Sequence, residues 1–181
     1  MEQVLEAVDR RSACGKRDYA MLLLLATYGL RACEVAALTL DDIDWRNERL
    51  KIRDRKAGNS TTYPLSTIVG AAIVDYLKNG RPSTTHREVF MRCSAPLAPI
   101  GHAAVISRAG HFIRKAGISV PRAGSHVLRH SCVQRLLNAH FSLKQIADYV
   151  GHQNASSTQI YGKIAVEQLR EVALGDGEDV L

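Results

Sequence analysis

The feature that most limits the fold of this chain is an unbroken apolar run, Met21–Ala26, inside a helical pattern over Lys16–Tyr28. A helix that is apolar on most faces must be enclosed by other elements, so the run predicts the central helix of a packed domain. The run is also far too short to cross a bilayer, which takes about 20 residues. A chain of 181 residues with 46% apolar composition can enclose such a helix in a single domain.

Charge and cysteine content narrow the class of protein. Taken alone, the net charge of +6 favours plain solubility over nucleic-acid binding, so it becomes informative only beside residues that handle phosphate. The four cysteines are widely spaced and include no C-x-x-C pair, which predicts reduced, mostly buried thiols rather than a disulfide framework or a zinc site. These cysteines are Cys14, Cys33, Cys93 and Cys132. No signal-peptide layout is present, so we expect a cytoplasmic protein without a membrane segment.

Helical spacing marks several further segments. Residues 2–10 predict a first helix, and Gly29 breaks the pattern after the central one. A short helix beyond Arg31 is then expected to carry Cys33, Val35, Ala36 and Leu38 towards the core. The other expected elements are a helix over Thr67–Lys78 with Ser66 as N-cap, a short strand over Val89–Met91, and a helix over His102–Lys115 with Val105, Ile106 and Ile113 inward.

Two β-prone segments interrupt the helices. Leu50–Arg53 alternates apolar and charged residues, and Thr61–Leu65 is rich in residues that favour strands. Lys56–Asn59 between them is typical of a hairpin turn. The sequence therefore predicts an α+β domain that is mostly helical and has a small antiparallel sheet.

The second half of the chain gathers residues that can bind or attack a phosphate. A helix over Ser125–Asn138, capped by Ser125, would place His126, Arg129 and His130 on one face, because positions three and four apart lie one turn above each other. A shorter helix over Phe141–Val150 is closed by Gly151. His152 follows, Tyr161 stands beyond a polar run, and an amphipathic helix is expected over about Ile164–Ala173.

These residue types suit phosphodiester transfer to a protein side chain. Such a reaction needs a nucleophile, a clamp on the non-bridging oxygens and an acid for the leaving oxygen. A tyrosine hydroxyl can attack reversibly, and an arginine fork meets phosphate oxygens in pairs and stays charged. Histidines add donors near neutral pH. No acidic metal-binding cluster lies beside these residues, so we expect neither a metal nor a cofactor.

Several segments together resemble the catalytic domain of the tyrosine recombinases, the phage integrase family. The matching segments are Gly29–Leu38, Lys56, His126–His130, Gly151-His152 and Tyr161, in that order along nearly the whole chain. The resemblance implies the DNA breaking-rejoining fold of that family. It also implies double-stranded DNA as the partner, and self-association on DNA from dimer to tetramer.

The resemblance implies a role for each matching side chain. Tyr161 would attack the scissile phosphate and form a 3′-phosphotyrosyl link. Arg31 and Arg129 would hold the non-bridging oxygens, and Lys56 would protonate the departing 5′-oxygen. His126 and His152 would hydrogen-bond the phosphate and assist proton movement.

Each residue also has an ordinary structural reading. Tyr161 could be a core tyrosine, Arg31 an exposed helix-start residue and Lys56 a solvated turn lysine, with Arg55 serving instead if the hairpin register slips. His130 is better read as a supporting histidine, and Glu34 as a partner that orients Arg31 or stabilises the fold. The basic residues between positions 108 and 122 fit a DNA-facing surface or a solvated one.

Domain organisation and function follow as expectations. Family members carry a helical DNA-clamping domain before the region that begins here at Met1. We therefore expect a catalytic domain over residues 1–174, an acidic flexible tail over 175–181, and no N-terminal core-binding domain in this chain. The expected activity is site-specific recombination; the alternatives are a type IB topoisomerase-like enzyme, which reseals the same strand, and a non-catalytic DNA-binding accessory module.

Overall fold

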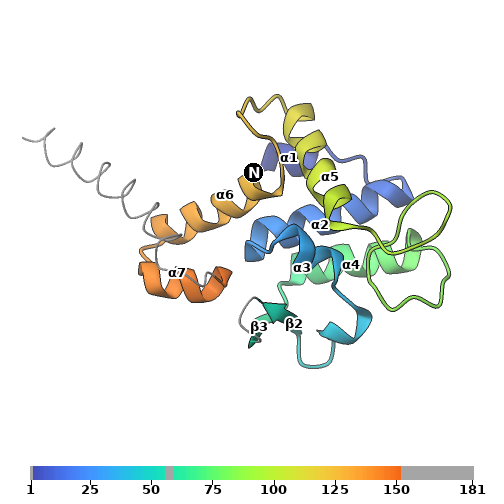
Figure 1. The fold of residues 1–181 in the computed structure, drawn as a ribbon, viewed down its shortest axis with the longest axis horizontal. Coiled ribbons are helices and arrows are strands. Elements are labelled where there is room, and N and C mark those ends of the chain that lie inside the picture. The colour runs from blue at the N-terminus through green and yellow to red at the C-terminus, as the bar shows by residue number, and fades with distance from the viewer. Residues whose placement is uncertain (1, 56–58, 152–181) are drawn as a thin grey trace, which may run out of the picture.

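The structure, a computed structural model, describes residues 2–55 and 59–151, and within them one small sheet lies at the edge of a group of helices (Figure 1). The helices are α1 (Glu2–Glu6), α2 (Ala13–Tyr28), α3 (Ala32–Ala36), η1 (Leu40–Asp42, a 3-10 turn), α4 (Thr67–Asn79), α5 (His102–Lys115), α6 (Ser125–Asn138) and α7 (Leu143–Val150). The strands are β1 (Ile43–Asp44), β2 (Arg49–Arg55) and β3 (Asn59–Pro64). The predicted mostly helical α+β class is confirmed.

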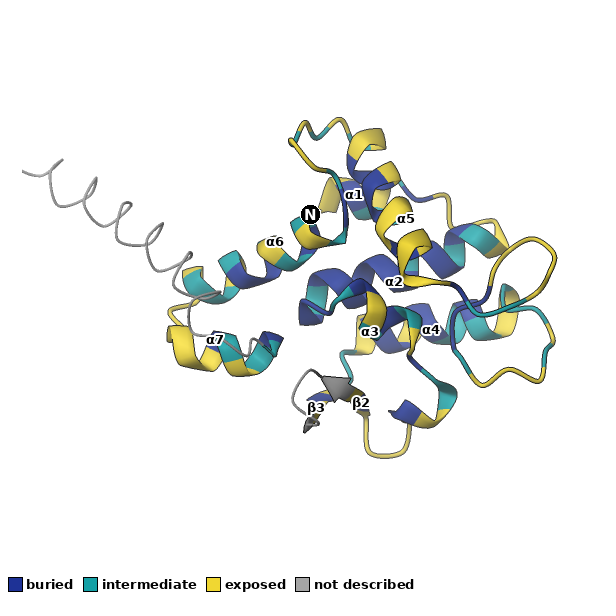
Figure 2. Ribbon diagram, in the orientation of Figure 1, coloured by how far each residue is buried: buried dark blue, intermediate teal, exposed yellow. Residues whose placement is uncertain are grey.

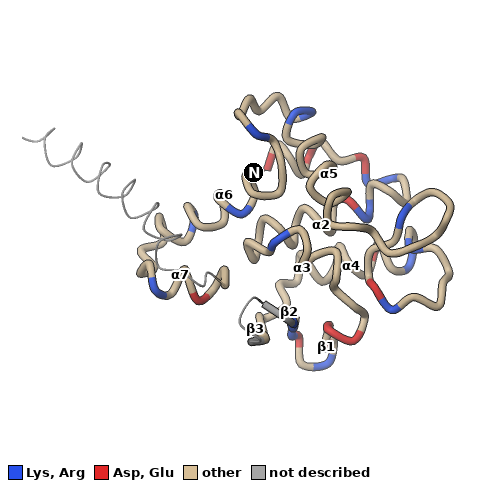
Figure 3. The backbone as a smooth tube through the Cα atoms, in the orientation of Figure 1, with Lys and Arg blue, Asp and Glu red and all other residues tan. Residues whose placement is uncertain are grey.

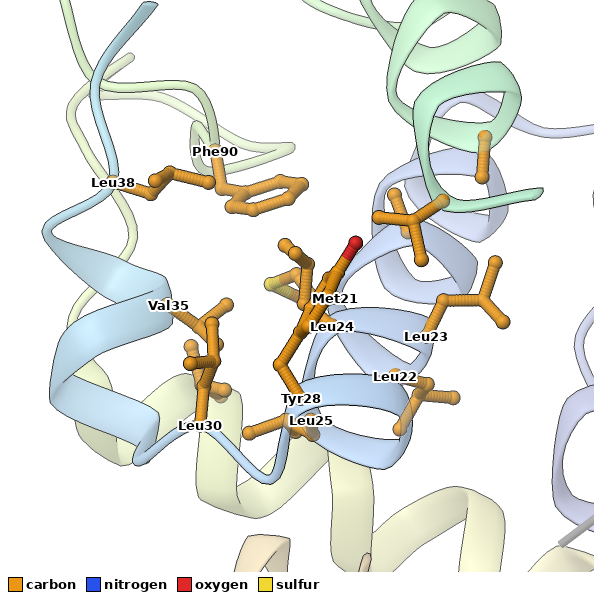
Figure 4. Packing of buried hydrophobic residues seen from close by; sticks show 14 of the residues in the cluster. Met21, Leu22, Leu23, Leu24, Leu25, Tyr28, Leu30, Val35, Leu38 and Phe90 are labelled. Atoms are coloured by element: carbon orange, nitrogen blue, oxygen red, sulfur yellow. The ribbon is translucent and has the colours of Figure 1, made fainter. Parts of the chain in front are cut away.

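Helix α2 is the central element that the apolar run predicts. It contacts α1, α3, α4, α5 and α6, and its middle residues are buried on every face (Figures 2 and 4). The helix begins three residues before the predicted start, because the Ser12 hydroxyl accepts a hydrogen bond from the Gly15 amide at 3.0 Å and caps the first turn. It ends at Gly29, which has a left-handed backbone with φ 61°.

The sheet is antiparallel, as predicted, and has the order β1-β2-β3, in which β1 is a strand that the sequence did not predict. Leu50 on β2 pairs with Tyr63 on β3, and both side chains are buried. The register becomes irregular between Ile52 and Arg55, towards the tip of the hairpin. Acidic residues gather around η1 and β1 beside this sheet (Figure 3).

Three expectations about burial are wrong. Cys33 is exposed, because it lies about 200° around α3 from the buried Val35. Cys93 is exposed and Cys14 half-buried, so Cys132 alone of the four thiols is buried. Ile106 is 41% exposed, because its neighbour there is Gly124, which has no side chain to cover it.

Residues Val89–Met91 are buried but form no strand with a single neighbour. Their backbone is shared among several partners: the Val89 amide donates to the Leu38 carbonyl at 2.8 Å, and the Phe90 carbonyl accepts from the Ile100 amide at 2.9 Å. The Met91 amide donates to the Tyr76 hydroxyl at 3.1 Å. Isolated bridges on either side, Thr39 to Glu88 and Met91 to Pro99, replace the predicted strand.

Helices α4 to α7 match the predicted segments, with small changes at their ends. Helix α5 has the predicted bounds, and α4 extends one residue further than predicted. Helix α6 is capped by Gly124, so Ser125 is its first residue rather than its cap. Helix α7 begins after Ser142, whose side chain and that of Gln145 cap each other's backbone amides.

Several predicted features lie outside the described residues. These are Lys56, His152, Tyr161, the helix over Ile164–Ala173 and the tail over 175–181. In the ranges 2–55 and 59–151, no helix is both long and apolar enough to span a bilayer.

Gly29 offers a test of how tightly α7 packs on the end of α2. A Cβ atom there would lie 3.0 Å from Cγ1 of Val150 and 3.3 Å from Sγ of Cys132, and φ is left-handed as well. We expect Gly29→Ala to lower the free energy of unfolding in urea by more than the roughly 1–2 kcal/mol that a left-handed non-glycine residue costs. Gly117→Ala is the matched control, because Gly117 also has a positive φ but nothing lies within 4 Å of its Cβ position. Equal losses in the two variants would contradict this packing.

Candidate active site

Arg31 lies at the junction that follows α2, as the N-cap of α3. Its Nη1 donates to Oε1 of Glu34 at 2.9 Å, and its backbone amide donates to Oε2 of the same carboxylate at 2.7 Å. The Glu34 side chain is only 6% exposed. Nη2 of Arg31 donates to the Gly151 carbonyl at 2.7 Å. Glu34 therefore holds Arg31 in one orientation, as the sequence suggested, and the guanidinium reaches the end of α7.

Arg129 approaches the same place from α6. Its Nη1 donates to the Gly29 carbonyl, and its Nη2 donates to the Val150 carbonyl at 2.8 Å. Gly29 is two residues before Arg31, and Val150 is next to Gly151. The fold thus brings together two arginines that lie far apart in the sequence, and each donates to a carbonyl at the end of α7.

The C-terminal ends of α2 and α7 stabilise the guanidinium groups that lie beside them. The last carbonyls of a helix have no partner inside it, and that end carries partial negative charge. Both α2 and α7 end in a left-handed glycine, Gly29 and Gly151, which turns the chain and leaves carbonyls accessible. The two arginines donate to these carbonyls, and the carbonyls in turn fix the plane of each guanidinium.

Two more side chains of α6 bind the end of α2. Nη2 of Arg135 donates to the Ala26 carbonyl, and the Cys132 thiol donates to the Thr27 carbonyl at 3.3 Å. Sequence reasoning did not identify these carbonyl partners, because backbone acceptors leave no sequence signal. Only the glycines at helix ends pointed to the position.

The histidines of α6 lie beside Arg129. The rings of His126 and His130 are edge-to-face with centroids 6.2 Å apart, as expected for positions four apart on one helix face. The His130 side chain is exposed by surface area, but partial desolvation, followed by the nearby His126 and Arg129, lowers its pKa from the ordinary value of 6.5. The lowered pKa favours the neutral form of His130.

Three of the six predicted site residues lie in the described part of the chain. Arg31 and Arg129 meet at the ends of α2 and α7, and His126 lies about one turn before Arg129 on α6. Lys56, His152 and Tyr161 lie outside the described residues. Within the described ranges, His, Cys, Asp and Glu form no group of three or more that could hold a metal ion.

Comparison with known proteins places this chain in a family. The model of the phage integrase family matches residues 1–168, and the chain belongs to that family. The protein y4gC of Sinorhizobium fredii, named an integrase/recombinase, is 41% identical over 91% of this chain and 85% of its own length. The tyrosine recombinase XerC 2 of Ralstonia nicotianae is 31% identical over 95% of this chain and 50% of its own. This chain thus spans most of one relative and half of the other.

Solved structures agree on the fold. The XerA recombinase matches with a TM-score of 0.78 at 23% identity, over 99% of this chain and 63% of XerA. The XerH recombinase bound to a palindromic difH substrate also gives 0.78, at 20% identity, over 95% of this chain and 50% of XerH. The expected tyrosine-recombinase catalytic fold is therefore confirmed.

The shifted pKa of His130 predicts how stability depends on pH. Because the folded-state pKa is lowered, the unfolded chain binds more protons between the two pKa values, so this residue makes stability fall as pH drops below about 6.5. We expect His130→Gln to flatten the pH dependence of the urea midpoint between pH 5 and pH 7. The matched control is His102→Gln on α5, because His102 is exposed as His130 is. An unchanged slope in His130→Gln would contradict the assignment.

Proposed function

We propose that this chain is the catalytic domain of a site-specific DNA recombinase that cuts and rejoins DNA through a 3′-phosphotyrosyl intermediate. The observation that carries the proposal is the convergence of Arg31 and Arg129 at the ends of α2 and α7, directly before His152. Membership of the phage integrase family and relatives named as recombinases support the same reaction.

The proposed step uses the side chains in fixed roles. The Tyr161 oxygen forms a bond to phosphorus while the bond from phosphorus to the 5′-oxygen breaks. The phenolic proton passes to His126 or His152, and the Lys56 ammonium gives its proton to the departing 5′-oxygen. Arg31 and Arg129 neutralise the non-bridging oxygens as negative charge grows on them. Attack by another 5′-hydroxyl reverses these bonds and seals the strand without an external energy source.

The partner in this proposal is double-stranded DNA. Structural neighbours that include XerH on difH and the Tn1549 integrase on transposon DNA support it. Recombination exchanges strands between two sites, so we propose that several copies assemble on DNA. A type IB topoisomerase-like enzyme would use the same chemistry, and relaxation of supercoiled plasmid without strand exchange would favour that alternative.

The nucleophile can be tested on DNA of randomised sequence. A pool of duplexes with a randomised segment and a nick lets the short 5′-hydroxyl fragment diffuse away after cleavage, which traps the covalent protein–DNA adduct. We expect the parent chain to form adducts that denaturing gels resolve and sequencing identifies, and Tyr161→Phe to form none, because phenylalanine has no attacking oxygen. Adducts formed by Tyr161→Phe would overturn the assignment, and a parent that binds DNA without cleaving it would favour the accessory-module alternative.

A second prediction concerns the arginine clamp. On the duplex recovered from that pool, Arg129→Lys should slow cleavage by about 10²-fold or more, because lysine cannot offer two fixed donors to one phosphate. Arg135→Lys is the matched control: it lies on the same helix and binds the Ala26 carbonyl, and its cleavage rate should stay within about threefold of the parent. Equal slowing in both variants would indicate that α6 acts only as a structural support.

A further inference from the structure

Three consecutive carbonyls end α7, and each accepts a hydrogen bond from a different element. The Tyr149 carbonyl accepts from the Tyr63 hydroxyl on β3, Val150 from Arg129 on α6, and Gly151 from Arg31 beside α3. Two of the three donors are the arginines of the proposed clamp. The third, Tyr63, is a buried tyrosine to which the proposed reaction assigns no role.

Tyr63 belongs to a closed set of tyrosine contacts, the tyrosine triangle, formed with Tyr28 and Tyr149. The ring of Tyr63 lies 5.1 Å from that of Tyr28 and 5.1 Å from that of Tyr149, centroid to centroid. The Tyr28 hydroxyl donates to the Pro64 carbonyl at 2.9 Å, and the Tyr149 hydroxyl donates to the Thr27 carbonyl at 3.2 Å. Each tyrosine hydroxyl therefore donates to a backbone carbonyl at or beside the next tyrosine of the triangle. Together the three hydrogen bonds join α2, the end of β3 and α7.

The hydroxyls of the tyrosine triangle remain hydrogen-bond donors at neutral pH. Burial raises the pKa of the Tyr28 and Tyr149 hydroxyls, so both remain protonated at neutral pH. The two ring contacts of Tyr63 add aromatic packing to these hydrogen bonds. The end of α7 is thus held at Tyr149 by hydrogen bonds and ring packing, one residue before the carbonyl that binds Arg129.

We propose that Tyr63 is a positioning residue for the strand-cleavage reaction: its hydroxyl fixes the end of α7, so that the Val150 and Gly151 carbonyls hold Arg129 and Arg31 in line with the scissile phosphate. The inference rests on the proposed function, because it assigns the arginines to the phosphate. Without the Tyr63 hydroxyl, the last turn of α7 shifts, and both guanidinium planes shift with the carbonyls that hold them. A displacement of about 1 Å is enough to slow an aligned reaction strongly.

The test compares two forms of the duplex recovered from the randomised pool. One has an ordinary scissile phosphate, and the other has a methylphosphonate there, in which a methyl group replaces one non-bridging oxygen and removes the negative charge. A neutral phosphorus centre gains less stabilisation from a guanidinium charge. A variant with misplaced arginines should therefore lose less of its cleavage rate on the methylphosphonate duplex. Arg129→Lys provides the benchmark for such selective recovery.

We expect Tyr63→Phe, which keeps the ring and removes the hydroxyl, to slow cleavage of the ordinary duplex about tenfold. On the methylphosphonate duplex its rate should return to within about threefold of the parent. Tyr76→Phe is the matched control, because Tyr76 is an equally buried tyrosine whose hydroxyl binds the Met91 amide away from the site. Its rates on both duplexes should stay near those of the parent.

The remaining outcomes distinguish a failure of this inference from a failure of the proposed function. If the parent forms no adduct, the proposed function fails and the inference fails with it. If the parent cleaves, then equal slowing of Tyr63→Phe on both duplexes, no slowing at all, or an Arg129→Lys variant that does not recover would each overturn the inference alone. Should Tyr63→Phe not fold, Tyr149→Phe, which frees α7 from the Thr27 carbonyl, must show the same selective recovery.

Discussion

Hydrogen bonds from guanidinium groups to helix-end carbonyls join the ends of α2 and α7, and the proposed site depends on them. Helices α2 and α7 both end at left-handed glycines, and their last carbonyls need donors that the helices do not supply. Arg129 donates to both ends at once, and Arg31 donates to the end of α7. Hydrogen bonds to charged groups contribute about 1.5–3 kcal/mol each, so the fold and the proposed phosphate clamp depend on the same side chains.

Much of the fold was predictable because its signals are local. The apolar run of α2 required burial on all sides, and the apolar spacing from His102 to Lys115 gave the bounds of α5. The antiparallel hairpin followed from two β-prone segments around a turn. Errors arose where tertiary neighbours decided the outcome: Ile106 faces Gly124, which cannot cover it, and Val89–Met91 shares its backbone among several partners.

The site was predictable only in its residue types. The motif around His126 and Arg129 indicated phosphate chemistry, and the resemblance to a family connected it with Arg31. No pattern in the sequence showed that Gly29, Val150 and Gly151 would hold the two arginines, because their acceptors are backbone carbonyls. The link from Tyr63 to the end of α7 joins residues far apart in the chain and depends on how β3 and α7 pack.

The most direct test of the arginine clamp is a crystal structure of Tyr161→Phe bound to the duplex recovered from the randomised pool. We predict one phosphate within hydrogen-bond distance of both Arg31 and Arg129, while their bonds to the Gly29, Val150 and Gly151 carbonyls remain. A DNA backbone that passes elsewhere, or arginines that leave the carbonyls and point away from the phosphate, would contradict the clamp.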